Sequence, residues 1–210
     1  MVQEKFLVRR GFTDNHLREL TINGNELKFE DGDSTNPFKI FPGPEIKDYR
    51  FGIRWIKFEL TYGREYQIFV RDSDNNSIKI TFKSYFGRKR NQLHKLYINI
   101  LDRLWDCYFS RMVDRYREQF ADGMEFSIND VLFNKDFIEI SVSGIVSQSR
   151  KRIYWDNVRT SSYWTYFAIY SVENPSEINR GYSYKEDWNT NVLYSTLRTI
   201  LREKGIEKYE

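Results

Sequence analysis

The residue types that perform catalysis are scarce in this chain, whose 210 residues include only two histidines and one cysteine. General acid–base and nucleophilic catalysis commonly use His, Cys or paired carboxylates that are fixed close together. His94 follows Leu93 in a predicted helix, and Cys107 lies between Asp106 and Tyr108 with no base nearby in the sequence. We therefore expect His94 at the surface and Cys107 in a buried or half-buried position, and we predict no catalytic residue.

A cluster of acidic and amide side chains at residues 72–76 begins like a calcium-binding loop. The EF-hand pattern needs Gly at its sixth position and Glu at its twelfth, where this chain has Ser77 and Lys83. We interpret the cluster as a hairpin turn, and we predict neither a metal site nor a cofactor. The single cysteine excludes a disulfide within the chain.

Two clusters of basic residues are the candidate sites for an anion or a charged partner. The first lies where a helix is predicted to begin, and helix N-termini attract anions. The corresponding residues of the second half are acidic and aromatic, Glu186-Asp187-Trp188. The second basic cluster lies in a predicted loop, and the alternative for both is an ordinary solvated surface. The candidate residues are Arg88, Lys89, Arg90, Arg150, Lys151 and Arg152.

The overall charge and hydropathy exclude some classes of protein. The chain has 33 basic and 30 acidic residues, a balance too even for a dedicated nucleic-acid binder with a one-sided basic face. The N-terminus lacks the apolar run of a signal peptide, and no stretch reaches the ~18 continuous apolar residues of a membrane span. We therefore expect a soluble, cytoplasmic protein.

The two halves of the chain match each other without a gap at a separation of 100 residues. Ile53 and Trp55 fall on Ile153 and Trp155, and a fixed internal period indicates duplicated structure. The alternative is that both halves are rich in strands and that their alternating patterns coincide by chance. The match predicts two domains, residues 1–120 and 121–210. Further identities pair Tyr66 with Tyr166, Ile78 with Ile178, Asn91 with Asn191 and Leu93 with Leu193.

The hydrophobic pattern predicts strands followed by one helix in each half. Alternating apolar residues indicate strands, and the turn Asn23-Gly24-Asn25 predicts a hairpin. Apolar residues then recur at helical spacing over about residues 89–118. A second helix is predicted from Asn189 or Asn191, capped by a side-chain oxygen, to a point before Gly205. The clearest predicted strands are residues 20–22, 27–29, 51–60, 66–70 and 78–82 in the first half.

This order of strands and helix resembles the pleckstrin-homology-like superfold. The strand with Ile53 and Trp55, ahead of the central hairpin, is similar to an apolar-x-Trp strand of small bacterial members. The resemblance implies an α+β fold in which each domain is a strand meander or small barrel of two sheets, closed by its C-terminal helix. The eukaryotic family carries a tryptophan inside that helix, whereas Trp188 precedes it here. The basic spacing used for inositol phosphates is absent, so phosphoinositide binding is not implied.

The first predicted helix is longer than the second, and its extension carries large apolar side chains. The extension is either a connector that packs on the second domain or a face for a second copy of the chain, because large apolar patches are seldom left bare. The candidate interface residues are Trp105, Phe109, Met112 and Tyr116.

Three functions are compatible with these features. The favoured one is a non-enzymatic binding or scaffold module for a protein or peptide, captured at a sheet edge or beside a closing helix. The second is recruitment to an anionic membrane surface or nucleic acid through the basic clusters, with an affinity that falls as salt rises. The third is an enzyme with an unrecognised site. Fold alone does not choose among them.

Overall fold

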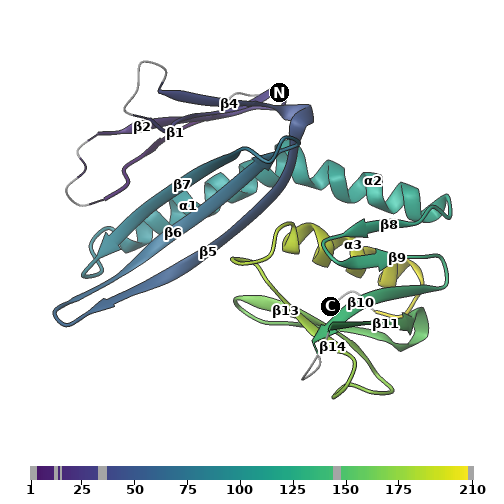
Figure 1. Cartoon of the computed structure of the whole chain (residues 1–210). Helices are drawn as coiled ribbons and strands as arrows, with labels where there is room; N and C mark the ends of the chain where they lie inside the picture. The colour runs from purple at the N-terminus through teal and green to yellow at the C-terminus, as the bar shows by residue number, and fades with distance from the viewer. Residues whose placement is uncertain (1–3, 12–13, 15, 33–36, 144–147, 208–210) are drawn as a thin grey trace. The chain divides into compact units, whose positions relative to one another are not determined.

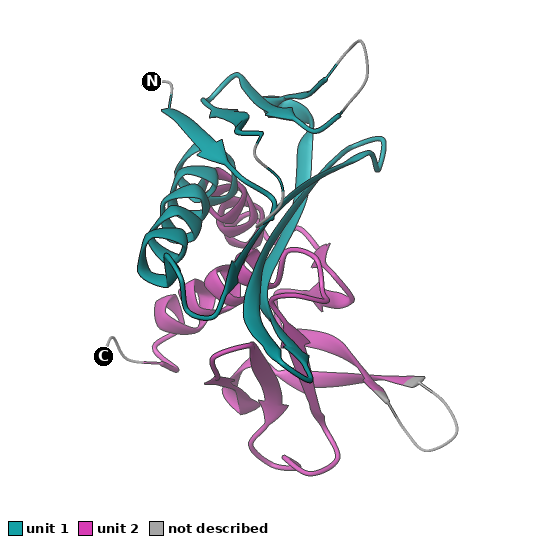
Figure 2. Cartoon of the chain, turned by 90° about the vertical axis from the view of Figure 1, so that its left-hand side faces the viewer, with its two compact units in different colours: residues 1–110 teal, residues 111–210 magenta. Residues whose placement is uncertain are grey.

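The structure is a computed structural model of the chain, and it describes residues 4–11, 14, 16–32, 37–143 and 148–207. It divides into two compact units, residues 1–110 and 111–210 (Figure 2). The described residues form a mixed α+β fold with four antiparallel sheets, which confirms the predicted class. The pairing of the described strands closes no barrel.

Unit 1 begins with a four-stranded meander. The predicted hairpin turn is confirmed, because the Asn23 side-chain oxygen accepts the backbone N–H groups of Asn25 and Glu26 at 2.8 and 3.0 Å. Leu20, on one side of this turn, and Leu27, on the other, are fully buried. The strands are paired in chain order, as β1 (Glu4–Val8), β2 (Arg18–Ile22), β3 (Glu26–Glu30) and β4 (Phe38–Pro42).

The second sheet of unit 1 contains the longest strands (Figure 1). It follows the short helix η1 (Gly43–Glu45), and its order is β5 (Ile46–Phe58), β6 (Thr61–Asp72) and β7 (Ser77–Tyr85). Gly63 permits β6 to approach β7 closely, since a Cβ there would lie 2.5 Å from the Ser84 carbonyl oxygen. The turn after β6 is a hairpin turn, as predicted: the Asp72 carboxylate accepts the backbone N–H of Asn76 at 2.8 Å.

A helical run follows β7, close to the predicted range. It comprises α1 (Arg90–Leu104), the π-helical turn η2 (Trp105–Phe109) and α2 (Ser110–Ala121). The buried side chains of α1 are Tyr97, Ile100 and Leu104, and α1 packs against β1, β6 and β7. Cys107 is buried in the π-helical turn, as expected.

Unit 2 has the same order of elements, with shorter strands in its second sheet. Its C-terminal helix buries one apolar face, including Leu193, Leu197 and Leu201. The first sheet contains β8 (Phe126–Ile128), β9 (Val131–Phe133), β10 (Phe137–Ser143) and β11 (Gln148–Tyr154). After η3 (Trp155–Asn157) come β12 (Val158–Ser162), β13 (Tyr166–Ser171), β14 (Asn179–Ser183) and α3 (Thr190–Glu203).

The helices of the two units begin at equivalent positions. Each is preceded by a residue in the left-handed region, Lys89 with φ 52° before α1 and Asn189 with φ 53° before α3. The predicted side-chain cap of the second helix is wrong for Asn189, whose side chain makes no capping hydrogen bond, and Lys89 makes none before the first helix. The backbone conformation, and not a capping oxygen, is therefore what the two helix starts share.

The match of the two halves at a separation of 100 residues does not hold for the strands that precede the helices. Trp55 lies within β5 and is exposed, whereas Trp155 begins η3, is buried and donates its indole N–H to the Asn134 carbonyl at 3.0 Å. The two tryptophans are therefore not equivalent. The cause is a difference in strand length, because β5 has 13 residues and β12 has 5.

Candidate functional site

A cavity of about 430 Å³ lies in unit 1 beside the start of α1. Its walls come from β1 and the residues after it, the start of β2, the end of β7 and the first turns of α1. Two kinds of side chain dominate the lining, and no described residue that lines it is acidic. The apolar ones are Leu7, Leu17, Leu93 and Leu96, and the basic ones are Arg9, Lys83, Arg88 and Lys89.

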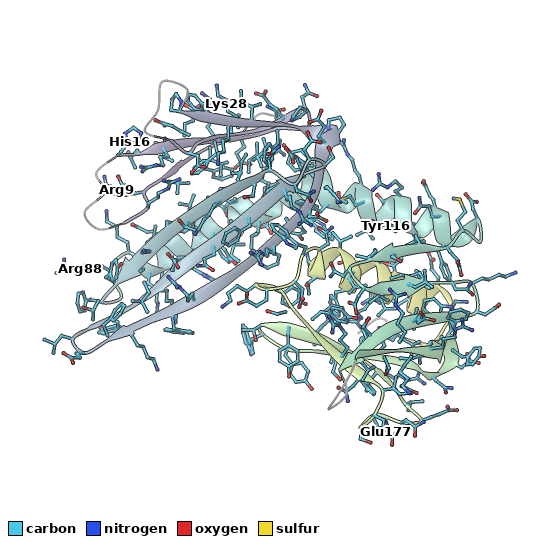
Figure 3. All side chains as sticks on the ribbon, viewed as in Figure 1. Arg9, His16, Lys28, Arg88, Tyr116 and Glu177 are labelled. Carbon is cyan, nitrogen blue, oxygen red and sulfur yellow. The ribbon has the colours of Figure 1, made fainter. Side chains whose placement is uncertain are left out.

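Two of the three residues of the predicted Arg88-Lys89-Arg90 cluster therefore line this cavity. Figure 3 shows Arg9 and Arg88 at the same end of unit 1. Both are exposed, and neither forms an ion pair with a described acidic residue. Arg90 lines a neighbouring hollow of about 450 Å³ together with Gly87 and Lys89. Arg9 was missed in the sequence because it precedes the helix by about eighty residues.

Among the basic side chains that line the cavity, Lys83 is the one that forms an ion pair with a described acidic residue: its Nζ lies 3.4 Å from Glu65 Oε1. Arg54 contacts the other oxygen of Glu65 at 2.7 Å. Burial opposes ionisation of Glu65, but the hydrogen bond from Gln67 and the charges of Lys83 and Arg54 outweigh it and lower its pKa. Glu65 therefore neutralises part of the positive charge beside the cavity.

The loop between β7 and α1 positions the basic side chains through an uncommon backbone path. Phe86, Gly87 and Lys89 all have positive φ angles, of 52°, 70° and 52°. The Ser84 hydroxyl donates to the Arg88 carbonyl at 2.8 Å, which ties the loop to β7. Left-handed residues other than Gly cost about 1–2 kcal/mol, and such strain is concentrated at functional sites.

The hairpin of β5 and β6 extends beyond the end of β7, since Tyr85 is paired with Gly63 while β5 and β6 stay paired to Phe58 and Thr61. Its end is apolar and exposed: Phe58 is 77 % and Leu60 is 90 % exposed. We call this group the unit 1 tip, and its members are Trp55, Phe58, Leu60, Tyr62 and Phe86.

The unit 1 tip adjoins the basic loop directly. Phe86 lies in that loop and packs edge-on against Tyr62, with ring centroids 5.4 Å apart. Arg64 lies over the Trp55 ring at 4.3 Å, and the exposed Lys57 is next to Phe58 in the chain. Exposed apolar groups and cations therefore lie close together at one end of unit 1, with one exposed acidic residue, Glu59, between Phe58 and Leu60.

The matching hairpin of unit 2, between β12 and β13, also ends in exposed aromatic side chains. Trp164 is fully exposed, and Tyr163 stacks on Tyr166 with ring centroids 4.5 Å apart. We call Tyr163, Trp164 and Tyr166 the unit 2 tip. Sequence reasoning missed both tips because an aromatic residue in a strand pattern resembles a core residue. The available signal was their position at turns.

The second predicted basic cluster lies in a strand, so the predicted loop is wrong. Arg150, Lys151 and Arg152 belong to β11, an edge strand of its sheet. Alternate residues share a face, and Arg150 and Arg152 both contact Glu139, at 3.3 and 3.2 Å. The hydrogen bond from Arg152 helps to lower the pKa of the Glu139 carboxyl. Lys151 is exposed.

The candidate interface residues of the long helix have mixed surroundings. Phe109 is fully buried and stacks on Tyr49 at 3.7 Å, so its assignment to a subunit-facing surface is wrong. Tyr116 is half-buried and stacks on Phe126 at 5.0 Å within unit 2. Trp105 and Met112 are half-buried. A second copy of the chain on this helix stays a prediction.

The remaining candidates do not assemble a reactive group. His94 is exposed and near the rings of Tyr66 and Tyr97. In the part of the chain that the structure describes, no three His, Cys, Asp or Glu side chains are grouped to hold a metal ion. No described helix is both long and apolar enough to span a bilayer. No protein-family model matches the chain, and no curated protein matches its sequence.

Proposed function

We propose that this chain is a non-enzymatic module that binds anionic membrane surfaces through the two tips and the basic loop of unit 1. The observation that carries the proposal is the unit 1 tip, where exposed Phe58 and Leu60 lie on the hairpin whose Tyr62 packs on Phe86 of the basic loop. This combination of apolar and cationic groups suits the interface of an anionic bilayer.

The energies of the two kinds of group favour the same partner. Trp and Tyr prefer the interface between bilayer and water, and binding there grows with the apolar area buried and with attraction to anionic lipids. Each Lys or Arg near such a surface contributes about 1 kcal/mol. The basic residues that supply this attraction in unit 1 are Lys57, Arg88, Lys89 and Arg90.

We also propose that each unit is a pleckstrin-homology-like domain. Four strands, then three strands, then a helix follow one another in each unit, which supports this assignment. The closure of a barrel by α1 or α3 belongs to the same proposal. The membrane function does not depend on it, because it rests on the tips and the basic loop.

Binding of a protein or peptide is the second candidate. The observation that favours it is β11, an edge strand whose Arg150, Lys151 and Arg152 are all exposed. An extended acidic peptide could pair with such an edge. Exposed basic residues on an edge strand also serve to prevent pairing with other chains. The exposed apolar residues of the tips have no such alternative role, so they support membrane binding more strongly than β11 supports peptide binding.

Co-sedimentation with vesicles tests the membrane proposal. The full chain should bind vesicles of phosphatidylcholine and phosphatidylserine, and it should bind pure phosphatidylcholine far less. The double change Phe58→Ser and Leu60→Ser should weaken binding about tenfold, because it removes apolar area that would be buried at the interface.

The matched control is Ile40→Ser, because Ile40 is an exposed aliphatic residue of unit 1 outside the tip. This change should leave vesicle binding unaltered. Equal binding to both kinds of vesicle, or a double variant that binds like the unaltered chain, would refute the proposal. Retention on single-stranded oligonucleotides in place of vesicles would favour the nucleic-acid alternative.

A further inference from the structure

We infer that the cavity beside the start of α1 is a binding site for a single-chain anionic amphiphile, a molecule with a phosphate or carboxylate head and an alkyl chain. This inference rests on the proposed function, since it names what unit 1 would bind at a membrane surface. It goes further by locating a defined site, distinct from the tips.

The basic side of the cavity is suited to the head group. Arg9, Arg88 and Lys89 reach it from the end of β1 and the start of α1, and none has an ion pair with a described acidic residue. The positive end of the helix dipole adds to their charge. Arginine binds phosphate and carboxylate with two parallel hydrogen bonds, which favours these two head groups over other anions.

The apolar side of the cavity is suited to the alkyl chain. Leu93 and Leu96 are half-buried on α1, and Leu7 and Leu17 are 59 % and 46 % exposed. An alkyl chain that covers these exposed leucines removes apolar surface from water, which favours binding. A volume of about 430 Å³ falls in the range of sites for small molecules.

The same lining argues against other anionic ligands. Inorganic phosphate would leave the four leucines unused. A single-stranded nucleic acid needs aromatic platforms for its bases, and Tyr85 is the sole aromatic residue among the described residues that line the cavity. A head with an attached chain uses both sides of the site.

Isothermal titration of the full chain with dodecyl phosphate, below its aggregation concentration, tests the inference. Inorganic phosphate and an uncharged dodecyl glucoside are titrated beside it. We expect dodecyl phosphate to bind at least about tenfold more tightly than either one, because only it engages both sides of the cavity. Equal affinity for inorganic phosphate, or for the glucoside, would overturn the inference.

Variants then locate the site. Arg9→Gln with Arg88→Gln, and separately Leu7→Ser with Leu17→Ser, should each weaken binding about tenfold or more. The control Lys95→Gln changes an exposed cation on the same helix outside the cavity lining, and it should have no effect. Phe58→Ser with Leu60→Ser should also have no effect. A loss with the tip variant but not with the cavity variants would place the amphiphile on the tip and refute the inference.

The source of the ligand is resolved by competition, and the two proposals can fail separately. If dodecyl phosphate releases the chain from anionic vesicles, the ligand is a membrane lipid; if it binds without releasing the chain, the ligand is a free amphiphile. Both results support the site.

Binding of dodecyl phosphate without any vesicle binding would refute the proposed function alone, and vesicle binding without dodecyl phosphate binding would refute this inference alone.

Discussion

At the scale of single residues, Glu65 connects the stability of unit 1 to the charge of the cavity. Its carboxylate is nearly buried and contacts Arg54 and Lys83, while Gln67 donates a hydrogen bond to it at 2.7 Å. The acid stabilises the sheet and reduces the charge that Lys83 presents to a ligand. Removal of the charge of Glu65 should therefore lower the stability of unit 1 and raise its affinity for an anionic ligand.

Glu65→Gln should therefore destabilise the protein by about 1–3 kcal/mol near neutral pH, because charged hydrogen bonds are lost. It should also raise the affinity for dodecyl phosphate severalfold, because Lys83 loses its acidic neighbour. Urea unfolding and titration measure the two effects. A fall in affinity would instead show that Glu65 orients Lys83 for the ligand.

The pH dependence follows from the lowered pKa of Glu65. A carboxyl with a folded-state pKa below its usual value of 4.5 contributes stability above that value, and the contribution is lost as pH falls through the folded-state pKa. The difference in stability between the unaltered chain and Glu65→Gln should therefore shrink in acid. A difference that stays constant down to about pH 3 would contradict this assignment.

The surroundings of single residues were also the feature that the sequence predicted least completely. The burial of Cys107 was predicted correctly, because a free cysteine is among the residue types most often buried. Phe109 was assigned to an interface, but it stacks on Tyr49, which lies sixty positions earlier. Contacts between distant segments such as these have no local signature in one sequence.

At the scale of elements, the loop from β7 to α1 combines strain with positive charge. Lys89 adopts φ 52°, a conformation that Asn tolerates better than Lys, and Asn189 occupies the equivalent place before α3. The unit 1 loop therefore keeps a residue that its backbone disfavours. A ligand that needs the ammonium group would account for this choice.

Lys89→Asn should stabilise the protein by about 0.5–1 kcal/mol, since it relieves left-handed strain, while it weakens dodecyl phosphate binding. Thermal unfolding and titration report the two effects. Lys89→Gln is the matched control: it removes the charge and retains the strain, so it should weaken binding with no gain in stability. A stabilised Lys89→Asn variant with unchanged affinity would remove Lys89 from the site.

Most elements of unit 1 could be predicted because their periodicity is local. The strands and the helix of residues 89–118 follow from alternation and helical spacing, and both are present. The basic cluster at residues 150–152 was placed in a loop because charged residues at an edge strand lack that alternation. The pairing of Arg150 and Arg152 with Glu139 depends on the neighbouring strand β10.

At the scale of the whole molecule, the two units have the same order of elements and both end a central hairpin in exposed aromatic residues. The sequence predicted two parts, with a boundary after residue 120. The units divide instead after Ser110, and Tyr116 and Phe120 of α2 pack on Phe126 and Trp155 of unit 2. The helical run of residues 90–121 contains no glycine or proline that would mark such a division in the sequence.

If each tip contributes to membrane binding, the effects of altering the two tips on the binding free energy should add. Phe58→Ser with Leu60→Ser, and Tyr163→Ser with Trp164→Ser, should each weaken binding to anionic vesicles about tenfold, and together about a hundredfold. Vesicle co-sedimentation of the three variants measures this. A unit 2 variant that binds like the unaltered chain would limit the membrane function to unit 1.

The exposure of Trp55 and Trp164 also has an optical consequence. The chain has five tryptophans, and these two lie at the ends of the hairpins while Trp155 is buried. Indole emission shifts to shorter wavelength when water leaves the ring, and a soluble quencher reaches only rings that stay in contact with solvent. The protein thus carries its own fluorophores at the surfaces proposed to bind the bilayer, so part of its intrinsic emission reports on the environment of the tips without an attached dye.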